Sequence, residues 1–109
     1  MRSAVRLNNG VSSGYVGILS AELHFPAARS LKDKRMHVRS AKKQLQNRFG
    51  AAVAEVDHHD LWQRSRLTLS CVAREYRELQ ELLDGAERYL GAQEFELAWA
   101  ERQVVTLDE

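Results

Sequence analysis

The hydrophobic residues near the start of the chain recur at every second position, which is the period of a β-strand. From Tyr15 to Phe25 the odd-numbered residues are apolar or small, whereas polar residues gather on the even-numbered side. Alternate side chains of a strand point to opposite faces, so we expect a strand whose odd-numbered face packs on the core. Pro26, which has no backbone N–H to donate, ends this strand.

From residue 31 the period changes to that of a helix. The apolar positions of this segment are Leu31, Val38, Ala41, Leu45 and Phe49. At 100° per residue they form a narrow stripe, which predicts an amphipathic helix over residues 31–49. Ser30 and Asp33 have the spacing of a capping box at its start, and Gly50 is a typical residue for its end.

The two periods then repeat along the rest of the chain. We expect a strand over residues 51–57, a turn at 58–60, a strand over 61–72, a helix over 74–90 and a last strand from Phe95 to Val104 or Val105. The order β-α-β-β-α-β predicts an α+β fold of the ferredoxin-like, split β-α-β type. Such a fold has a four-stranded antiparallel sheet with both helices on one face.

Length and composition are those of a single soluble domain. The chain has 109 residues, of which 44% are hydrophobic and 28% are charged. Residues 1–14 are rich in Ser, Asn and Gly and have no apolar period, so we expect a flexible tail before one domain at 15–109. The single cysteine, Cys71, excludes an internal disulfide framework. Because we find neither a secretory signal nor a run of about 20 apolar residues, we expect a cytoplasmic protein.

The net charge of +1 conceals a strong asymmetry between the two halves of the chain. Residues 1–48 contain ten Lys and Arg against two acids, whereas residues 49–109 contain six against thirteen. A local field of one sign attracts partners of the opposite sign even when the whole molecule is nearly neutral. The basic half is therefore the first place to look for a binding site.

Three blocks of sequence resemble the YlxP-like proteins. They are residues 22–35 (ELHFPAARSLKDKR), residues 47–49 (NRF) with 53–56 (VAEV), and residues 60–65 (DLWQRS). The resemblance covers roughly residues 15–105, and it implies a bacterial ferredoxin-like domain whose biochemical role is unassigned. Related members are often encoded beside translation-initiation and ribosome-maturation factors. This gene neighbourhood implies a role with RNA or the ribosome, and the implication rests on association and not on mechanism.

The predicted first helix carries the strongest candidate site. Its cations and those next to it are Arg29, Lys32, Arg35, Arg39, Lys42, Lys43 and Arg48, and Lys34 is also basic. Within residues 29–48 the one acid is Asp33. An arc of about 100° beside the apolar stripe holds five of these cations, namely Lys32, Arg35, Arg39, Lys42 and Lys43. A rigid basic arc matches the phosphates of a nucleic acid, although the same cations could instead be solvated or could pair with the acidic second helix.

Two neighbouring features give weaker signals. The free N–H groups at the start of the first helix, with Arg29, could hold one phosphate, but every capped helix offers part of this. Lys34 falls inside the apolar stripe, and we expect its stem to cross that stripe so that the ammonium reaches solvent.

The residues 57–60 (DHHD) contain side chains that suit a transition metal. Adjacent residues of a strand point to opposite faces, however, so only a turn could bring them together. We therefore interpret this segment as a polar hairpin turn, and we expect no metal or other cofactor.

Catalysis finds little support, and we expect no enzyme activity and no catalytic residues. Cys71 alternates with core positions, which is typical of a buried small hydrophobe. Ser20, Glu22 and His24 share one face of the first strand, but successive side chains there stand about 7 Å apart. That separation is too large for a hydrogen bond between a nucleophile and its base.

The sheet face away from the helices bears on the choice of partner. We expect it to present the even-numbered residues 16–24 of the first strand and 62–72 of the third, with Trp62 as the aromatic residue available for stacking bases. Stacking of RNA bases on this face is therefore not expected. Our leading hypothesis is an RNA- or ribosome-associated factor that docks its first helix on phosphate. The alternative is a protein-interaction or homodimerising module that uses the open sheet face or sets the basic helix against an acidic surface.

Overall fold

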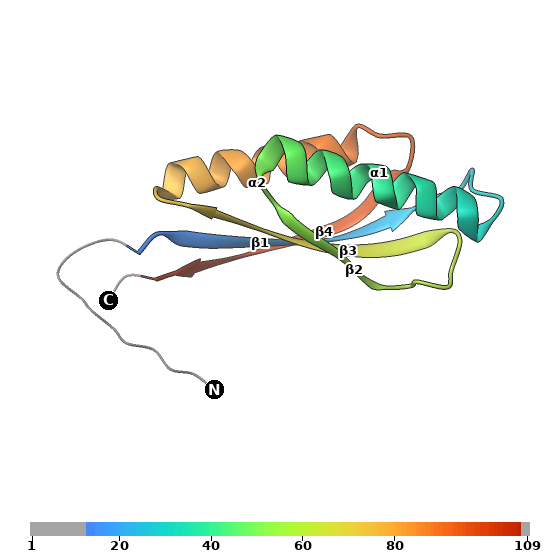
Figure 1. The fold of residues 1–109 in the computed structure, drawn as a ribbon, viewed down its shortest axis with the longest axis horizontal. Coiled ribbons are helices and arrows are strands. Elements are labelled where there is room, and N and C mark those ends of the chain that lie inside the picture. Colours follow the sequence, from blue (N-terminus) through green and yellow to red (C-terminus); the bar gives the residue numbers. More distant parts are fainter. Residues whose placement is uncertain (1–12, 108–109) are drawn as a thin grey trace.

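The computed structural model describes residues 13–107 and shows a four-stranded sheet with two helices on one face (Figure 1). The elements are β1 (Tyr15–His24), α1 (Leu31–Phe49), β2 (Ala52–Asp57), β3 (Arg64–Ala73), α2 (Tyr76–Gly91) and β4 (Glu96–Thr106). The strands lie in the order β2-β3-β1-β4, and every neighbouring pair is antiparallel. The α+β, ferredoxin-like prediction is confirmed.

The core lies between the sheet and the two helices, where the sequence period placed it. On β1 the odd-numbered Leu19, Ala21 and Leu23 are buried, as predicted. The same core contains Leu67, Leu69 and Cys71 from the neighbouring strand β3, Val38, Ala41 and Leu45 from α1, and Leu79, Leu83, Ala86 and Leu90 from α2. Because β1 and β3 are the two central strands, β2 and β4 form the exposed edges of the sheet.

Local hydrogen bonds explain why α1 begins and ends where it does. The Asp33 backbone N–H donates to Ser30 Oγ at 3.1 Å, and the Arg29 N–H donates to Asp33 Oδ2 at 3.1 Å. At the other end Gly50 adopts φ 62°, and its N–H donates to carbonyls of the last turn. A left-handed residue of this kind closes a helix at little cost when it is glycine. The predicted bounds of α1 are confirmed.

Two glycines allow the helices to approach their neighbours closely. A Cβ on Gly17 of β1 would lie 2.7 Å from Leu83 Cδ1, so the absence of a side chain lets α2 pack on this strand. A Cβ on Gly85 of α2 would lie 2.6 Å from the Phe49 ring of α1. Gly85 has a low helix propensity, and its place is explained by this helix–helix contact.

The structure differs from the sequence prediction at the start of β3. That strand begins at Arg64, whereas we expected it from Leu61, because residues 61–63 bend after the turn and leave Trp62 in the loop. The Phe25 N–H donates to the Gln63 carbonyl at 2.9 Å, which fixes this loop beside the end of β1. His58 adopts φ 66°, a left-handed conformation that is uncommon for a residue with a side chain.

The predicted tail falls mostly outside the described residues. Of residues 1–14 the structure describes Ser13 and Gly14, and the Gly14 carbonyl accepts a hydrogen bond from Leu107 N–H at 3.2 Å. Among residues 13–107 no helix combines the length and the apolar character needed to cross a membrane.

Candidate nucleic-acid interface

An open groove of about 640 Å³ runs between α1 and the edge strand β2. Its lining consists of Arg35, Val38, Arg39, Lys42, Lys43, Gln46, Asn47 and Glu55. The four cations occupy positions i, i+4, i+7 and i+8 of α1, which places them on one side of the helix. The sequence therefore predicted the arc, and the structure adds that the arc borders a groove.

The other predicted cations lie elsewhere. The Arg48 guanidinium stacks on the rings of Phe49 and Tyr89, 5.3 Å and 5.2 Å from their centroids, so it turns toward α2. Arg29 and Lys32 are exposed near the start of α1 and do not line the groove. The N–H of Arg29 donates to the Asp33 carboxylate, which therefore occupies part of the helix start that could have held a phosphate.

In the described part of the chain, the groove cations lack an anionic partner of their own. Within residues 13–107, none of Arg35, Arg39, Lys42 and Lys43 forms an ion pair. The acidic second helix does not neutralise them. Its Asp84 and Glu87 pair instead with Arg102 of β4, at 2.8 Å and 3.2 Å. The positive field of the groove is left available to a ligand.

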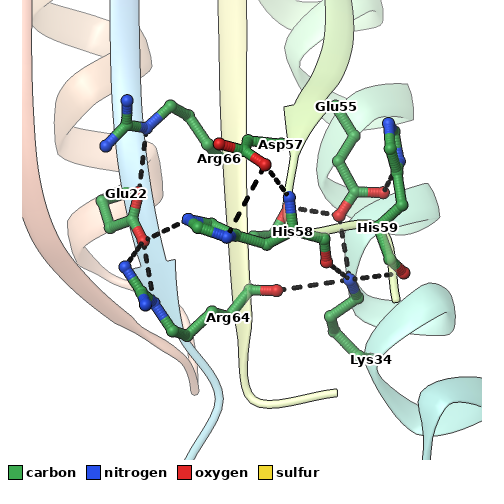
Figure 2. A network of polar contacts seen from close by, with 9 residues as sticks. Glu22, Lys34, Glu55, Asp57, His58, His59, Arg64 and Arg66 are labelled. Carbon is green, nitrogen blue, oxygen red and sulfur yellow. Dashed lines mark hydrogen bonds and ion pairs between the residues drawn. The ribbon is translucent and has the colours of Figure 1, made fainter. Parts of the chain in front are cut away.

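Glu55, which lines the groove, is the partner of Lys34, whose side chain is fully buried (Figure 2). Its ammonium pairs with Glu55 Oε2 at 3.0 Å. It also donates to the backbone carbonyls of His58, His59 and Arg64 at 2.8, 3.3 and 3.2 Å. Our expectation that Lys34 reaches solvent is wrong, because β2, the turn after it and the start of β3 together supply enough acceptors to bury the charge.

Glu55 is the partner that sequence analysis missed. Its Oε2 also accepts a hydrogen bond from Ser65 Oγ at 2.7 Å, and its Oε1 lies 3.2 Å from His59 Nδ1. Burial would raise the pKa of Glu55, but the hydrogen bonds from Ser65 and Lys34 outweigh burial and lower that pKa. Two signals could have found the pair: a lysine inside an apolar helix stripe, and a glutamate on the inward face of a short strand.

A second polar cluster lies on the open sheet face, where we had expected Glu22 to be exposed. Glu22 is 5% exposed. Arg64 donates to its Oε2 from Nη2 at 2.7 Å, and Arg66 donates to its Oε1 from Nε at 2.9 Å. Burial would raise the pKa of Glu22, but these two hydrogen bonds, with the charges of His58 and Arg64, lower it.

His58 links the two clusters (Figure 2). Its carbonyl accepts from Lys34, while its ring lies on the side of Glu22. Nε2 of His58 lies 3.1 Å from Glu22 Oε2 but forms no hydrogen bond within the described chain. The left-handed backbone of His58 is thus held from both sides, by a buried ammonium and by a carboxylate cluster.

Three other candidates from the sequence were a metal site, the Cys71 thiol and the Ser20 hydroxyl. No group of three or more His, Cys, Asp or Glu side chains among residues 13–107 could hold a metal ion. Cys71 is 1% exposed, and burial raises the pKa of its thiol. Ser20 Oγ lies 3.1 Å from Thr68 Oγ1, so the hydroxyl is directed at a neighbouring strand and not at His24.

The open face of the sheet has an apolar end and a charged end. Val16 of β1 lies between Val72 of β3 and Val105 of β4, and the two outer valines are 68% and 39% exposed. At the other end Trp99 is opposite Glu22, and the Arg66 guanidinium lies 5.1 Å from the Trp99 ring centroid. Trp99 alternates with Phe95 and Leu97 in the sequence, and the register shift between Glu22 and Leu23 places it on this face.

Comparison with known proteins agrees with the resemblance found in the sequence. Residues 16–103 match the family described as "Protein of unknown function (DUF503)". The chain is 29% identical over 72 residues to the uncharacterized protein YlxP of Bacillus subtilis (strain 168). This aligned region covers 62% of this chain and 78% of that protein. A solved structure, the de novo designed protein Ferredog-Diesel, matches 97% of this chain and 99% of its own with a TM-score of 0.43 and 13% identity.

Proposed function

This chain belongs to the DUF503 family, as its resemblance to YlxP-like proteins implied, and we propose that it is an RNA- or ribosome-associated binding protein. In this proposal the groove between α1 and β2 docks on phosphates, with Arg35 and Arg39 at its centre and Lys42 and Lys43 beside them. We also propose that the protein works in the cytoplasm, the location that a role at the ribosome would require.

The observation that carries the proposal is the set of four groove cations without an anionic partner in the described part of the chain. Glu55, the one acid that lines the groove, is already neutralised by the buried Lys34. The phosphates of an RNA backbone would therefore interact with four cations whose positive charge no carboxylate of the described chain offsets. Such binding is driven largely by the release of counterions from the nucleic acid.

We propose a binding function without catalysis. The buried Cys71 thiol and the Ser20 hydroxyl, which is directed at Thr68, support this proposal because neither is presented to a substrate beside a base. The groove itself offers cations and amides, which bind and orient an anion.

Sedimentation with purified ribosomal subunits tests the proposed function. We expect the tagged protein to co-sediment at low salt and to be released by nuclease. For purified RNA, about four phosphate contacts predict that log affinity falls against log salt with a slope of about −3 for a single strand and nearer −4 for a duplex. An absence of binding at low salt, or an affinity that does not change with salt, would refute the proposal.

A second candidate function is self-association through the open sheet face. It is favoured by the row of Val72, Val16 and Val105, whose outer two members are exposed, because apolar groups gain by leaving water. If this function is correct, the mass measured by sedimentation equilibrium should rise with concentration, and Val72→Asp should hold the protein as a monomer. A constant monomer mass in the wild type would exclude it.

A further inference from the structure

The lining of the groove gives information on the kind of RNA that fits it. Four of its eight residues are cations, two are amides, and none carries an aromatic ring. Proteins that bind single strands usually combine a basic groove with aromatic side chains on which the bases stack. Double-helical RNA is recognised differently, by its shape and through phosphates and 2′-hydroxyl groups. The lining resembles the second kind of site.

Two aromatic rings outside the groove are covered by arginine side chains. Phe49 follows the groove residues on α1, but the Arg48 guanidinium lies over it and its ring packs beside Gly85 of α2. On the open sheet face, the Arg66 guanidinium lies over one face of Trp99. No aromatic residue of the described chain, 13–107, lines the groove, so an unpaired base entering it would meet no stacking surface in its lining.

Resting on the proposed function, we infer that the ligand of the groove is the backbone of double-helical RNA, bound without reading of the bases. α1 has 19 residues and is about 28 Å long at 1.5 Å per residue, so it holds its cations at fixed positions along a straight rod. A regular row of attachment points for cations matches a stiff duplex, whose phosphates are also regularly spaced. A flexible single strand would lose conformational freedom on binding and gain no stacking in return.

Two amides at the end of the basic row favour RNA over DNA. Gln46 and Asn47 are exposed on the groove, one turn beyond Lys42 and Lys43. Their side chains make no hydrogen bond within residues 13–107. An amide side chain both donates and accepts, and a 2′-hydroxyl does the same. DNA lacks this hydroxyl, so the amides can distinguish the two duplexes while the cations cannot.

Fluorescence anisotropy with three labelled probes tests the inference. The probes are an RNA duplex of about 16 base pairs, a DNA duplex of the same sequence, and one unstructured RNA strand of that sequence. We expect the RNA duplex to bind at least about tenfold more tightly than the single strand. The double variant Gln46→Ala, Asn47→Ala should lose the preference for RNA over DNA and keep its affinity for the DNA duplex. Gln44→Ala, an exposed amide of α1 outside the groove, is the matched control and should change neither affinity.

The outcomes separate this inference from the proposed function. If the single strand binds as tightly as the RNA duplex, the duplex inference is wrong while RNA binding stands. If the wild type binds both duplexes equally, or the amide variant keeps its preference for RNA, the assignment of the 2′-hydroxyl contact is wrong. If no probe binds at low salt, the proposed function fails and the inference fails with it.

Discussion

Replacing Lys34 by methionine should lower the free energy of unfolding by about 3–5 kcal/mol, the usual cost of removing one partner from a buried ion pair. Methionine has a similar length and keeps the apolar stem, so the change removes mainly the charge and its donors. The Glu55 carboxylate would lose its cation, and the carbonyls of His58, His59 and Arg64 would lose a donor. Urea unfolding followed by circular dichroism measures the difference.

The same helix offers a matched control. Lys32→Met removes an exposed lysine two positions earlier, and it should change the free energy of unfolding by no more than about 0.5 kcal/mol. Combining Lys34→Met with Glu55→Gln removes both charges, so the double variant should be more stable than the sum of the single changes predicts, by about 0.5–3 kcal/mol. If Lys34→Met costs no more than Lys32→Met, the buried pair does not contribute to stability as argued.

The fold could be predicted from the sequence because its signals are local. Alternation along residues 15–25, the stripe of residues 31–49 and the glycine at position 50 each follow from backbone geometry, and the structure confirms all three. The basic arc of α1 was predicted for the same reason, since helical spacing alone decides which cations share a side. That Glu55 of β2 borders the groove beside the arc depends on strand order, which sequence period does not report.

The errors concern residues whose partners are distant in the chain. Lys34 and Glu55 are 21 positions apart, and Glu22 and Arg64 are 42 apart. A single charged residue in an apolar pattern either extends its charged end to solvent or pairs with a buried group of opposite charge. The identity of that partner becomes known only once the strands are placed. The turn at residues 58–60 shows the same difficulty, because its role is to present backbone carbonyls, which carry no sequence signal.

Reversing Arg35 and Arg39 to glutamate should weaken RNA binding about 100-fold at low salt. Each lost contact between a cation and a phosphate is expected to cost about tenfold, or 1.4 kcal/mol, and the new carboxylates repel the phosphates that remain. The slope of log affinity against log salt should also fall by about one for each lost contact. Both arginines are exposed, so we expect the variant to fold with a loss of about 0.5 kcal/mol for each change.

The control for this charge reversal must change the net charge equally at another surface. Arg74→Glu with Arg77→Glu does so at the start of α2, where both residues are exposed and neither lines the groove. A general attraction between protein and RNA would weaken equally in both double variants, because it depends on net charge alone. Binding through the groove requires the Arg35, Arg39 variant to lose far more affinity than its control. Equal losses of affinity in the two double variants would show that the basic arc is merely solvated. Affinity for RNA would then be a property of the whole surface.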